Sequence, residues 1–152
     1  MIHVFKRAWE DMLLPLWQRP KMVQVAALCY KDTPEGKKIL LITSRDTGRW
    51  IVPKGWPING KSGAQSALQE AWEEAGVSQA DIEAEPTGFY AYDKDINDGL
   101  SLPVVTQVYL TKVRNIEDDY PEAEERTRSW FTPAEAADLV AEPELAEILL
   151  TL

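Results

Sequence analysis

Three glutamates near the middle of the chain have a spacing that would let them act together. Glu70, Glu73 and Glu74 stand at positions i, i+3 and i+4 of a segment that runs from Gly55 to Val77. In a helix this spacing puts all three carboxylates on one face. Like charges so arranged repel one another, and a hard divalent cation with oxygen ligands would neutralise them. The triplet therefore predicts a metal site.

The surroundings of the triplet favour this interpretation over a simpler one. Acid-rich exposed helix faces are common, and Glu-x-x-Glu-Glu alone would indicate only a solvated surface. Here the glutamates follow the stretch 50–55, Trp-Ile-Val-Pro-Lys-Gly, in which a short strand leads into a loop. Gly76 stands just past the expected end of the helix, where glycine supplies a left-handed stop. A loop, a helix and a glycine stop in this order favour the metal site.

The same segment resembles the Nudix box, the signature of hydrolases that cut a nucleoside diphosphate linked to another group. The box reads G-x5-E-x7-R-E-U-x-E-E-x-G-U, with U an aliphatic residue. Seven of its nine specified positions match, with alanine as a permissive fit to the first U: Gly55, Glu70, Ala71, Glu73, Glu74, Gly76 and Val77. The likeness extends over roughly residues 23–139 and is closest to the branch that includes diphosphoinositol polyphosphate and diadenosine polyphosphate hydrolases. The flanking stretches that carry it are 25–30, 40–45, 49–53 and Trp130-Phe131.

Two positions depart from the box. Lys61 stands where the family has its first glutamate, and Gln69 stands where the family has arginine. In the family that arginine braces the adjacent glutamate, and the first glutamate can assist metal binding. The departures therefore bear on rate and metal affinity more than on reaction type.

The resemblance implies a role for each carboxylate. Glu73 and Glu74 would bind Mg²⁺ or Mn²⁺, while Glu70 would share the metal and take the proton from water. Which carboxylate is the base stays open at this point. Some Nudix enzymes add a carboxylate from a late loop, and here the choice among the acids of that region also stays open: Asp118, Asp119, Glu122, Glu124 and Glu125.

The expected substrate contacts are basic or backbone groups near the glycine loop. The formal net charge of −9 means that an anionic substrate must be met by a local cluster of cations. We expect Arg45, Lys54 and Lys61 to contact phosphate, and the backbone at Gly55 to approach phosphate closely because glycine lacks a side chain. The alternative for each cation is ordinary solvated surface or a surface salt bridge.

Composition excludes several other classes of protein. A single histidine, His3, leaves no histidine-centred triad and no zinc site with several His ligands. One cysteine, Cys29, rules out an internal disulfide, fits a reducing compartment and is expected in the core. The acidic balance argues against a general nucleic-acid surface, and no apolar run approaches the ~20 residues needed to cross a bilayer. We therefore expect a cytoplasmic protein without membrane contact; its oligomeric state is not predicted.

Apolar periodicity predicts the elements that position the glutamates. An amphipathic helix is expected over 4–17, before the domain proper, where it would pack on the domain or on a partner. The metal helix is expected from an N-cap at Ser62 to about Ala75, and further helices over 133–140 and from Pro143 to Leu150. Strands are expected at 23–30, 39–43, 50–52, 88–92, 104–113 and 129–131, with a polar loop from Asp93 to Ser101.

These elements predict a single α/β domain spanning residues 1–152, with a mixed sheet covered by helices on two sides. The Nudix resemblance implies the same α/β/α sandwich with a mixed central sheet. Trp72 is expected to pack in the core because helical phase turns it away from Glu70 and Glu74. Tyr90 and Tyr92 should share one face of a strand and pack there, whereas Trp56 is as compatible with a pocket wall as with packing.

The leading functional hypothesis is metal-dependent hydrolysis of a phosphoanhydride bond in a highly phosphorylated small molecule. Diphosphoinositol polyphosphates, diadenosine polyphosphates and related nucleoside diphosphate derivatives are the candidate substrates. The alternative is a catalytically weak or inactive Nudix-fold module that binds a ligand, which the Lys61 and Gln69 departures support. A partner-docking role for the N-terminal helix is a third hypothesis.

Overall fold

The structure is a computed structural model and describes residues 22–97 and 99–152. The helix predicted over 4–17, together with His3, lies outside the described residues. The described strands and helices place the glutamate segment against a central sheet.

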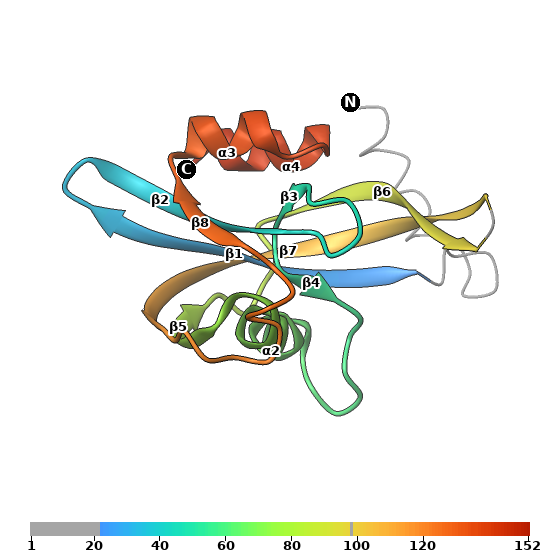
Figure 1. The fold of residues 1–152 in the computed structure, drawn as a ribbon, viewed down its shortest axis with the longest axis horizontal. Coiled ribbons are helices and arrows are strands. Elements are labelled where there is room, and N and C mark those ends of the chain that lie inside the picture. Colours follow the sequence, from blue (N-terminus) through green and yellow to red (C-terminus); the bar gives the residue numbers. More distant parts are fainter. Residues whose placement is uncertain (1–21, 98) are drawn as a thin grey trace.

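One mixed sheet forms the centre of the domain (Figure 1). Its strands are β1 (Val23–Thr33), β2 (Gly36–Thr43), β3 (Trp50–Ile51), β4 (Lys54–Gly55), β5 (Val77–Ile82), β6 (Gly88–Asn97), β7 (Leu100–Ile116) and β8 (Arg128–Phe131). The main path runs β3-β2-β1-β7-β5, while β4 pairs with β1, β6 with β7 and β8 with β2. Strands β1 and β7 are parallel, and the other pairs are antiparallel.

Helices cover both faces of this sheet. Figure 1 shows α2 (Gly63–Ala75) on one face and α3 (Pro133–Leu139) with α4 (Pro143–Leu150) on the other. Strand β1 alternates between the two cores: Val25, Ala27 and Cys29 pack toward α2, whereas Ala26 and Leu28 pack toward α3 and α4. Continuous burial on both faces explains why this strand reads as an unbroken apolar run. The predicted α/β/α sandwich with a mixed sheet is confirmed, as is the core position of Cys29.

The metal helix begins and ends where expected. The Ser62 side chain accepts from the Gln65 N–H, and the Gln65 side chain accepts from the Ser62 N–H, which forms a complete capping box. At the other end Gly76 is left-handed with φ 74°, and its N–H returns to the carbonyl oxygens of Ala71 and Trp72. A Cβ at Gly76 would also meet the Arg128 guanidinium at 2.5 Å, so glycine is required on two grounds.

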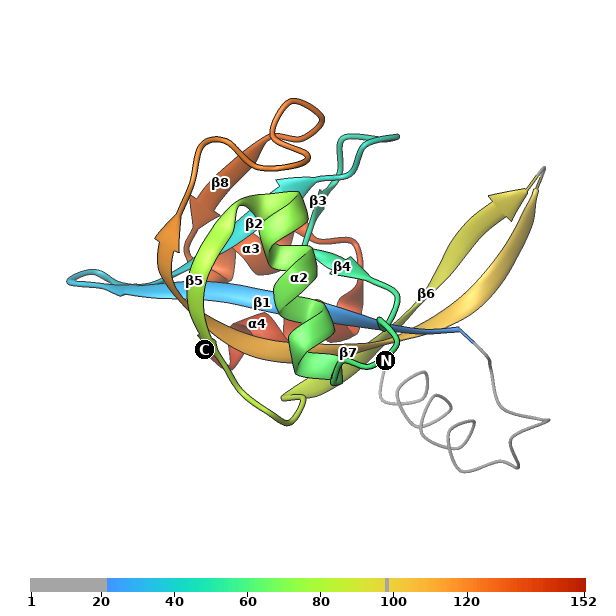
Figure 2. The ribbon, with the colours of Figure 1, turned by 90° about the horizontal axis from the view of Figure 1, so that it is seen from below.

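Three segments differ from the sequence-based expectation. Residues 93–101 were expected as a polar loop, but the antiparallel pairing of β6 and β7 continues through Asp95 and Ser101. In Figure 2 this pair extends beyond the body of the sheet as a two-stranded arm. Strand β5 was not predicted, because an irregular register between Val77 and Ala80 interrupts the apolar alternation of a half-buried strand. The two-residue β4 was also missed; it pairs with β1 and fixes the start of the glycine loop.

No helix among the described residues is both long enough and apolar enough to cross a membrane.

Candidate active site

The three box glutamates line one open pocket with a volume of about 550 Å³. The pocket lies where the C-terminal half of α2 meets the loops that leave β2, β4 and β7. The rest of its lining comes from β1 and β6, and the charged residues of the lining include both acids and bases. Besides the glutamates, the charged residues that line it are Arg45, Asp46, Arg49, Lys54, Asp93, Lys94, Asp95, Glu122 and Arg126.

Glu74 is the most firmly held of the three carboxylates. Only 7% of the residue is exposed, and its Oε1 accepts the backbone N–H of Lys54 at 3.2 Å. Its Oε2 lies 3.7 Å from Nη2 of Arg126. Because β4 supplies the donor N–H, the glycine loop and the metal helix are joined at the carboxylate itself.

Gly55 leaves space for the side chain of Glu70. A Cβ built on Gly55 would lie 2.4 Å from both Cδ and Oε1 of Glu70 and 2.8 Å from its Oε2. Such contacts are far shorter than van der Waals separation, so the Glu70 carboxylate occupies the space that the absent side chain leaves. We expected glycine here to let phosphate approach the backbone. The close approach exists, and the group that makes it is a carboxylate of the pocket.

The electrostatics of the pocket favour a shared proton on the metal-free carboxylates. Burial raises the pKa of Glu70 from 4.5 to about 8, aided by its hydrogen-bonding contact with Glu74 and the charges of Glu74 and Glu73. Burial also raises the pKa of Glu74, although Glu70, Arg126 and the Lys54 N–H act in the opposite direction. Excess negative charge of this kind is what a divalent cation would relieve.

The late-loop carboxylate that sequence left open is resolved by position. Of the five acids considered, only Glu122 lines the pocket with the box glutamates. Its N–H donates to the carbonyl oxygen of Glu73 at 3.0 Å, which ties the loop to the last turn of α2. The other four line a separate acidic hollow or are not in this pocket. Glu122 is therefore the late-loop acid that the structure places with the box glutamates.

Two of the predicted phosphate contacts lie in this pocket. Lys54 and Arg45 both line it, and burial lowers the pKa of Lys54. The Lys54 ammonium lies 5.4 Å from the centre of the Tyr92 ring. Arg45 is half exposed, and its Nη1 lies 3.3 Å from Glu125 and 3.7 Å from Glu122. Arg49 and Lys94 add two further cations to the lining of this pocket.

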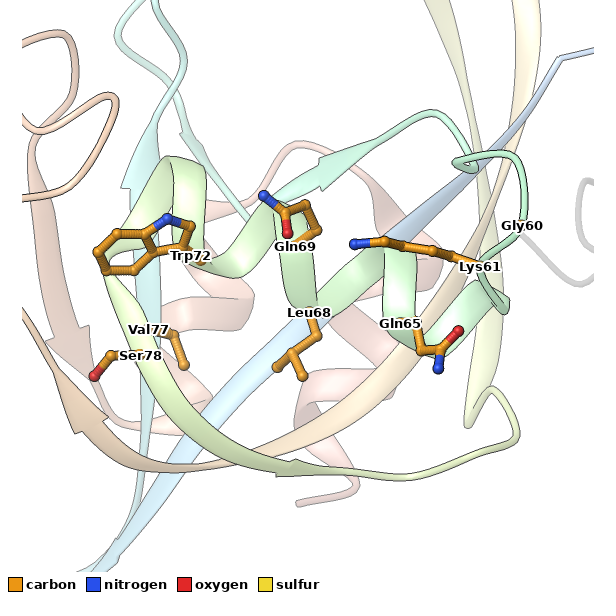
Figure 3. A pocket seen from close by; sticks show the side chains of 8 residues that line it. All are labelled: Gly60, Lys61, Gln65, Leu68, Gln69, Trp72, Val77 and Ser78. Carbon is orange, nitrogen blue, oxygen red and sulfur yellow. The ribbon is translucent and has the colours of Figure 1, made fainter.

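Lys61 and Gln69 lie elsewhere. Both line a second pocket of about 620 Å³ on the outer side of α2, with Leu68 and Trp72. In Figure 3 the Lys61 side chain runs back along the helix toward Gln69. The two departures from the box are therefore neighbours, and the structure does not bring Lys61 to the glutamates. Gln69 lines this outer pocket and not the pocket that contains Glu70.

The aromatic residues divide between core and pocket. Tyr90 is buried and packs against Tyr92 with ring centres 6.1 Å apart, as predicted. Tyr92 also lines the carboxylate pocket, where its hydroxyl donates to the Gln24 side chain. Trp56 lines the same pocket and is 43% exposed, which favours the pocket-wall alternative. Trp72 is only partly buried and borders the second pocket, so core packing was the wrong expectation for it.

The donor set fits a hard divalent ion in chemistry. Seven carboxylates line one pocket, among them Glu70, Glu73, Glu74 and Glu122, and such oxygens are the ligands that Mg²⁺ and Mn²⁺ prefer. Within residues 22–97 and 99–152, no three Asp, Glu, His or Cys side chains lie close enough together to coordinate a metal ion in their present conformations. Oxygens of Glu74 and Glu122 are directed instead at Arg126. The residues present would hold the ion after side-chain rotation.

Comparison with known proteins assigns the family. A family model described as NUDIX domain matches residues 22–152. The chain belongs to this family. Among curated relatives, human diphosphoinositol polyphosphate phosphohydrolase 3-alpha is 28% identical over 115 residues, which is 74% of this chain and 65% of the relative. The bovine 3-beta protein is 29% identical over the same shares. The matched part thus spans slightly less than two thirds of these relatives' length.

Solved NUDIX structures show the same fold. A Caenorhabditis elegans Ap4A hydrolase in a binary complex aligns with TM-score 0.66 at 21% identity, covering 85% of this chain and 93% of that one. The Escherichia coli dihydroneopterin triphosphate pyrophosphohydrolase gives 0.64 at 16%, covering 88% and 94%. The NUDIX domain of Shewanella oneidensis NrtR, complexed with ADP-ribose, gives 0.59 at 17%, covering 92% and 94%.

Proposed function

We propose that this NUDIX chain hydrolyses a phosphoanhydride bond in a highly phosphorylated small molecule, using Mg²⁺ or Mn²⁺. The observation that carries the proposal is the composition of one pocket, whose lining combines Glu70, Glu73, Glu74 and Glu122 with five Lys and Arg side chains. The curated relatives named as diphosphoinositol polyphosphate phosphohydrolases, and the fold shared with an Ap4A hydrolase, support the same substrate class.

The proposed division of labour follows from position. Glu73, Glu74 and Glu122 would hold the metal, which supplies charge neutralisation on the phosphates and activation of water when bound. Glu70 is our choice for the group that takes the proton from water. It is half-buried, and burial raises its pKa to about 8; a base whose pKa is near the working pH is the most efficient. Gly55 leaves room for its carboxylate.

The substrate class follows from the cations of the pocket. Arg45, Arg49, Lys54 and Lys94 line it, and among the described residues Lys54 and Lys94 form no salt bridge. Arg45 and Arg49 are paired with acids at 3.3–3.7 Å, half exposed, and such pairs are weak enough to exchange for phosphate. Several cations along one wall suit a chain of phosphates or a polyphosphorylated ring better than a lone diphosphate.

The alternative is a NUDIX module that binds its ligand without cleaving it. The Lys61 and Gln69 departures were its support, and their place on the outer side of α2 weakens it, because neither side chain lines the carboxylate pocket. Three of the four glutamates of the box, Glu70, Glu73 and Glu74, are retained, and all three line that pocket.

One experiment distinguishes the two. The protein is incubated with Mg²⁺ and a panel of diadenosine polyphosphates, diphosphoinositol polyphosphates and simple nucleoside diphosphate derivatives, and products are resolved by chromatography. We expect cleavage of a member with many phosphates, no cleavage with excess chelator, and none by Glu74→Gln. Tight binding of one member without products in any metal would establish the non-catalytic module instead.

A further inference from the structure

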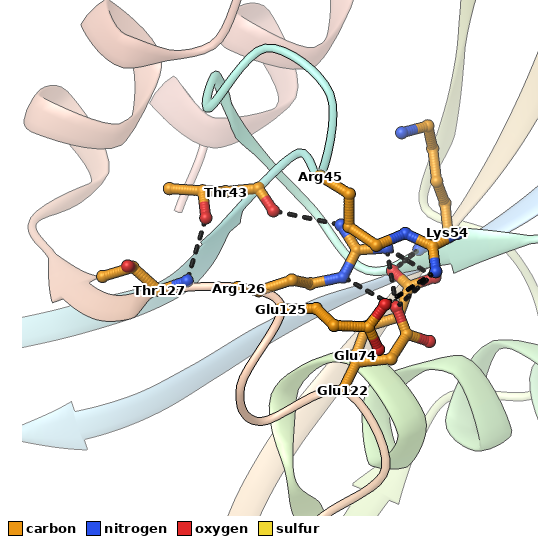
Figure 4. Close-up of polar contacts among 8 residues, drawn as sticks. All are labelled: Thr43, Arg45, Lys54, Glu74, Glu122, Glu125, Arg126 and Thr127. Atoms are coloured by element: carbon orange, nitrogen blue, oxygen red, sulfur yellow. Dashed lines mark hydrogen bonds and ion pairs between the residues drawn. The ribbon is translucent and has the colours of Figure 1, made fainter.

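A buried arginine that is not part of the box lies in the carboxylate pocket. The side chain of Arg126 is 7% exposed. Its Nε donates to Oε1 of Glu122 at 3.0 Å, and its Nη2 lies 2.9 Å from the same oxygen and 3.7 Å from Oε2 of Glu74. Figure 4 shows the guanidinium between these two carboxylates. It thus contacts two of the four groups that the proposed function assigns to the metal site.

Arg126 is held in place independently of those carboxylates. Its Nη1 donates to the carbonyl oxygen of Thr43, at the end of β2, at 3.0 Å. The next residue, Thr127, exchanges two hydrogen bonds of 2.9 Å with Thr43: one from its N–H to the Thr43 hydroxyl, the other from the Thr43 N–H to its carbonyl. The backbone on either side of the guanidinium is therefore fixed to the sheet (Figure 4).

The carboxylates depend on Arg126 more than it depends on them. Glu74 is buried, and a buried carboxylate without a partner carries a large desolvation cost. The same guanidinium makes the shortest ion pair of Glu122, at 2.9 Å, whereas the exposed Arg45 lies 3.7 Å from that carboxylate. A permanently charged, planar group with several donors suits this task, because it can hold two carboxylates at once and cannot lose its proton.

We propose that Arg126 is a positioning residue with a fixed positive charge: it holds Glu122 beside Glu74 before metal arrives, and its charge weakens the affinity of the site for a divalent ion. This inference rests on the proposed function, since it assumes that these carboxylates bind metal. A divalent ion that enters the pocket is repelled by the nearby guanidinium, which cannot move away because Thr43 and Thr127 hold it in place. The guanidinium therefore lowers metal affinity, and in return it keeps Glu74 and Glu122 oriented when no metal is bound.

The test is metal affinity, measured without substrate. Binding of Mn²⁺ is followed by the loss of its free-ion EPR signal in wild type, Arg126→Met, Arg126→Lys and Arg114→Met. We expect Arg126→Met to bind Mn²⁺ at least about tenfold more tightly, a small part of the Coulomb repulsion between a guanidinium and a divalent ion at this range. Arg126→Lys keeps the charge and should bind as wild type does. Arg114→Met is the matched control, because Arg114 forms an exposed pair with Asp81 outside the pocket.

A second measurement excludes a merely structural role. At saturating Mn²⁺ the turnover of Arg126→Met should fall, since Glu122 is no longer held, while the Mn²⁺ concentration for half-maximal activity falls as well. Loss of folded protein alone would lower turnover without tightening metal binding. If the Met variant does not fold, Arg126→Gln removes the charge while keeping a donor for the Thr43 carbonyl, and the same tightening is expected.

Unchanged or weaker Mn²⁺ affinity in a folded, uncharged variant would overturn the role of Arg126 while leaving the proposed function standing. If wild type itself binds no Mn²⁺ at millimolar concentration, both the proposed metal site and the inference built on it are wrong.

Discussion

Gly55→Ala is a small change that the structure predicts to act on chemistry and not on the fold. The new methyl group would stand 2.4 Å from the Cδ and Oε1 atoms of Glu70, and no backbone atom is among the nearest atoms it would meet. Gly55 also has a negative φ angle, which alanine can adopt without strain. The end of the Glu70 side chain must therefore move, while the strand and the helix can remain where they are.

The size of the effect follows from that distance. Ordinary contact begins near 3.4 Å, so the Glu70 carboxylate must retreat by about 1 Å. A displacement of about 1 Å at a reacting group can cost about a hundredfold in rate. The stability of the fold should be unchanged or slightly higher, because replacing glycine with alanine at a compatible backbone removes freedom from the unfolded chain, an effect of about 0.4–1 kcal/mol.

The assay is steady-state hydrolysis of the best panel substrate at saturating Mg²⁺, with thermal unfolding measured on the same samples. Gly88→Ala is the matched control: its methyl group would meet only the Ile148 side chain, at 2.8 Å, on the far side of the sheet. We expect kcat to fall about a hundredfold in Gly55→Ala and to stay within about twofold in Gly88→Ala. In a Glu70→Gln background, Gly55→Ala should add little. Wild-type kcat in Gly55→Ala would refute the assignment of Glu70.

Three further predictions follow from the pocket. Glu73→Gln and Glu74→Gln should each lower kcat by orders of magnitude while circular dichroism shows an intact fold. Near-native turnover in both variants would show that the metal does not bind at these residues. Lys61→Glu should leave the ranking of substrates by kcat/KM unchanged, because Lys61 lines the outer pocket; a shift toward simple nucleoside diphosphate derivatives would restore it as a phosphate contact. The pKa of Glu70 is raised from 4.5 to about 8 in the folded state, so its contribution to stability is full below pH 4.5 and is lost as pH rises through about 8. The melting temperature of metal-free protein should therefore fall between pH 5 and 9, and saturating Mg²⁺ should reduce the fall; an identical pH dependence with and without Mg²⁺ would contradict it.

Local signals predicted the parts of the fold that local interactions determine. The Ser62 cap, the Gly76 stop and the Thr132-Pro133 start all depend on residues within one helical turn, and each is confirmed. The apolar run at the start of β1 is likewise visible in sequence, since both faces of the strand are buried. Spacing within a helix is also local, which is why the three box glutamates reach the same pocket.

The elements that were missed depend on pairing between distant segments. Half of the residues of strand β5 are exposed, and the strand forms because it pairs with residues 111–116 of β7. Residues 93–97 and 100–101 of the arm are extended for the same reason. Arg126 could not be selected because its partners, Thr43 and Glu74, are brought to it only by the sheet. The one local hint was the i, i+4 spacing of Glu122 and Arg126, which is too common to indicate a site.

The central claim is that one divalent ion is bound by the carboxylates of α2. Crystals soaked with Mn²⁺ and measured near the manganese absorption edge would locate it directly by anomalous scattering. The account predicts the strongest anomalous peak at the carboxylate oxygens of Glu73, Glu74 and Glu122, beside Glu70. A strongest peak in the acidic hollow of Asp118 to Glu125, away from α2, would contradict it, as would the absence of any peak at a Mn²⁺ concentration that saturates turnover.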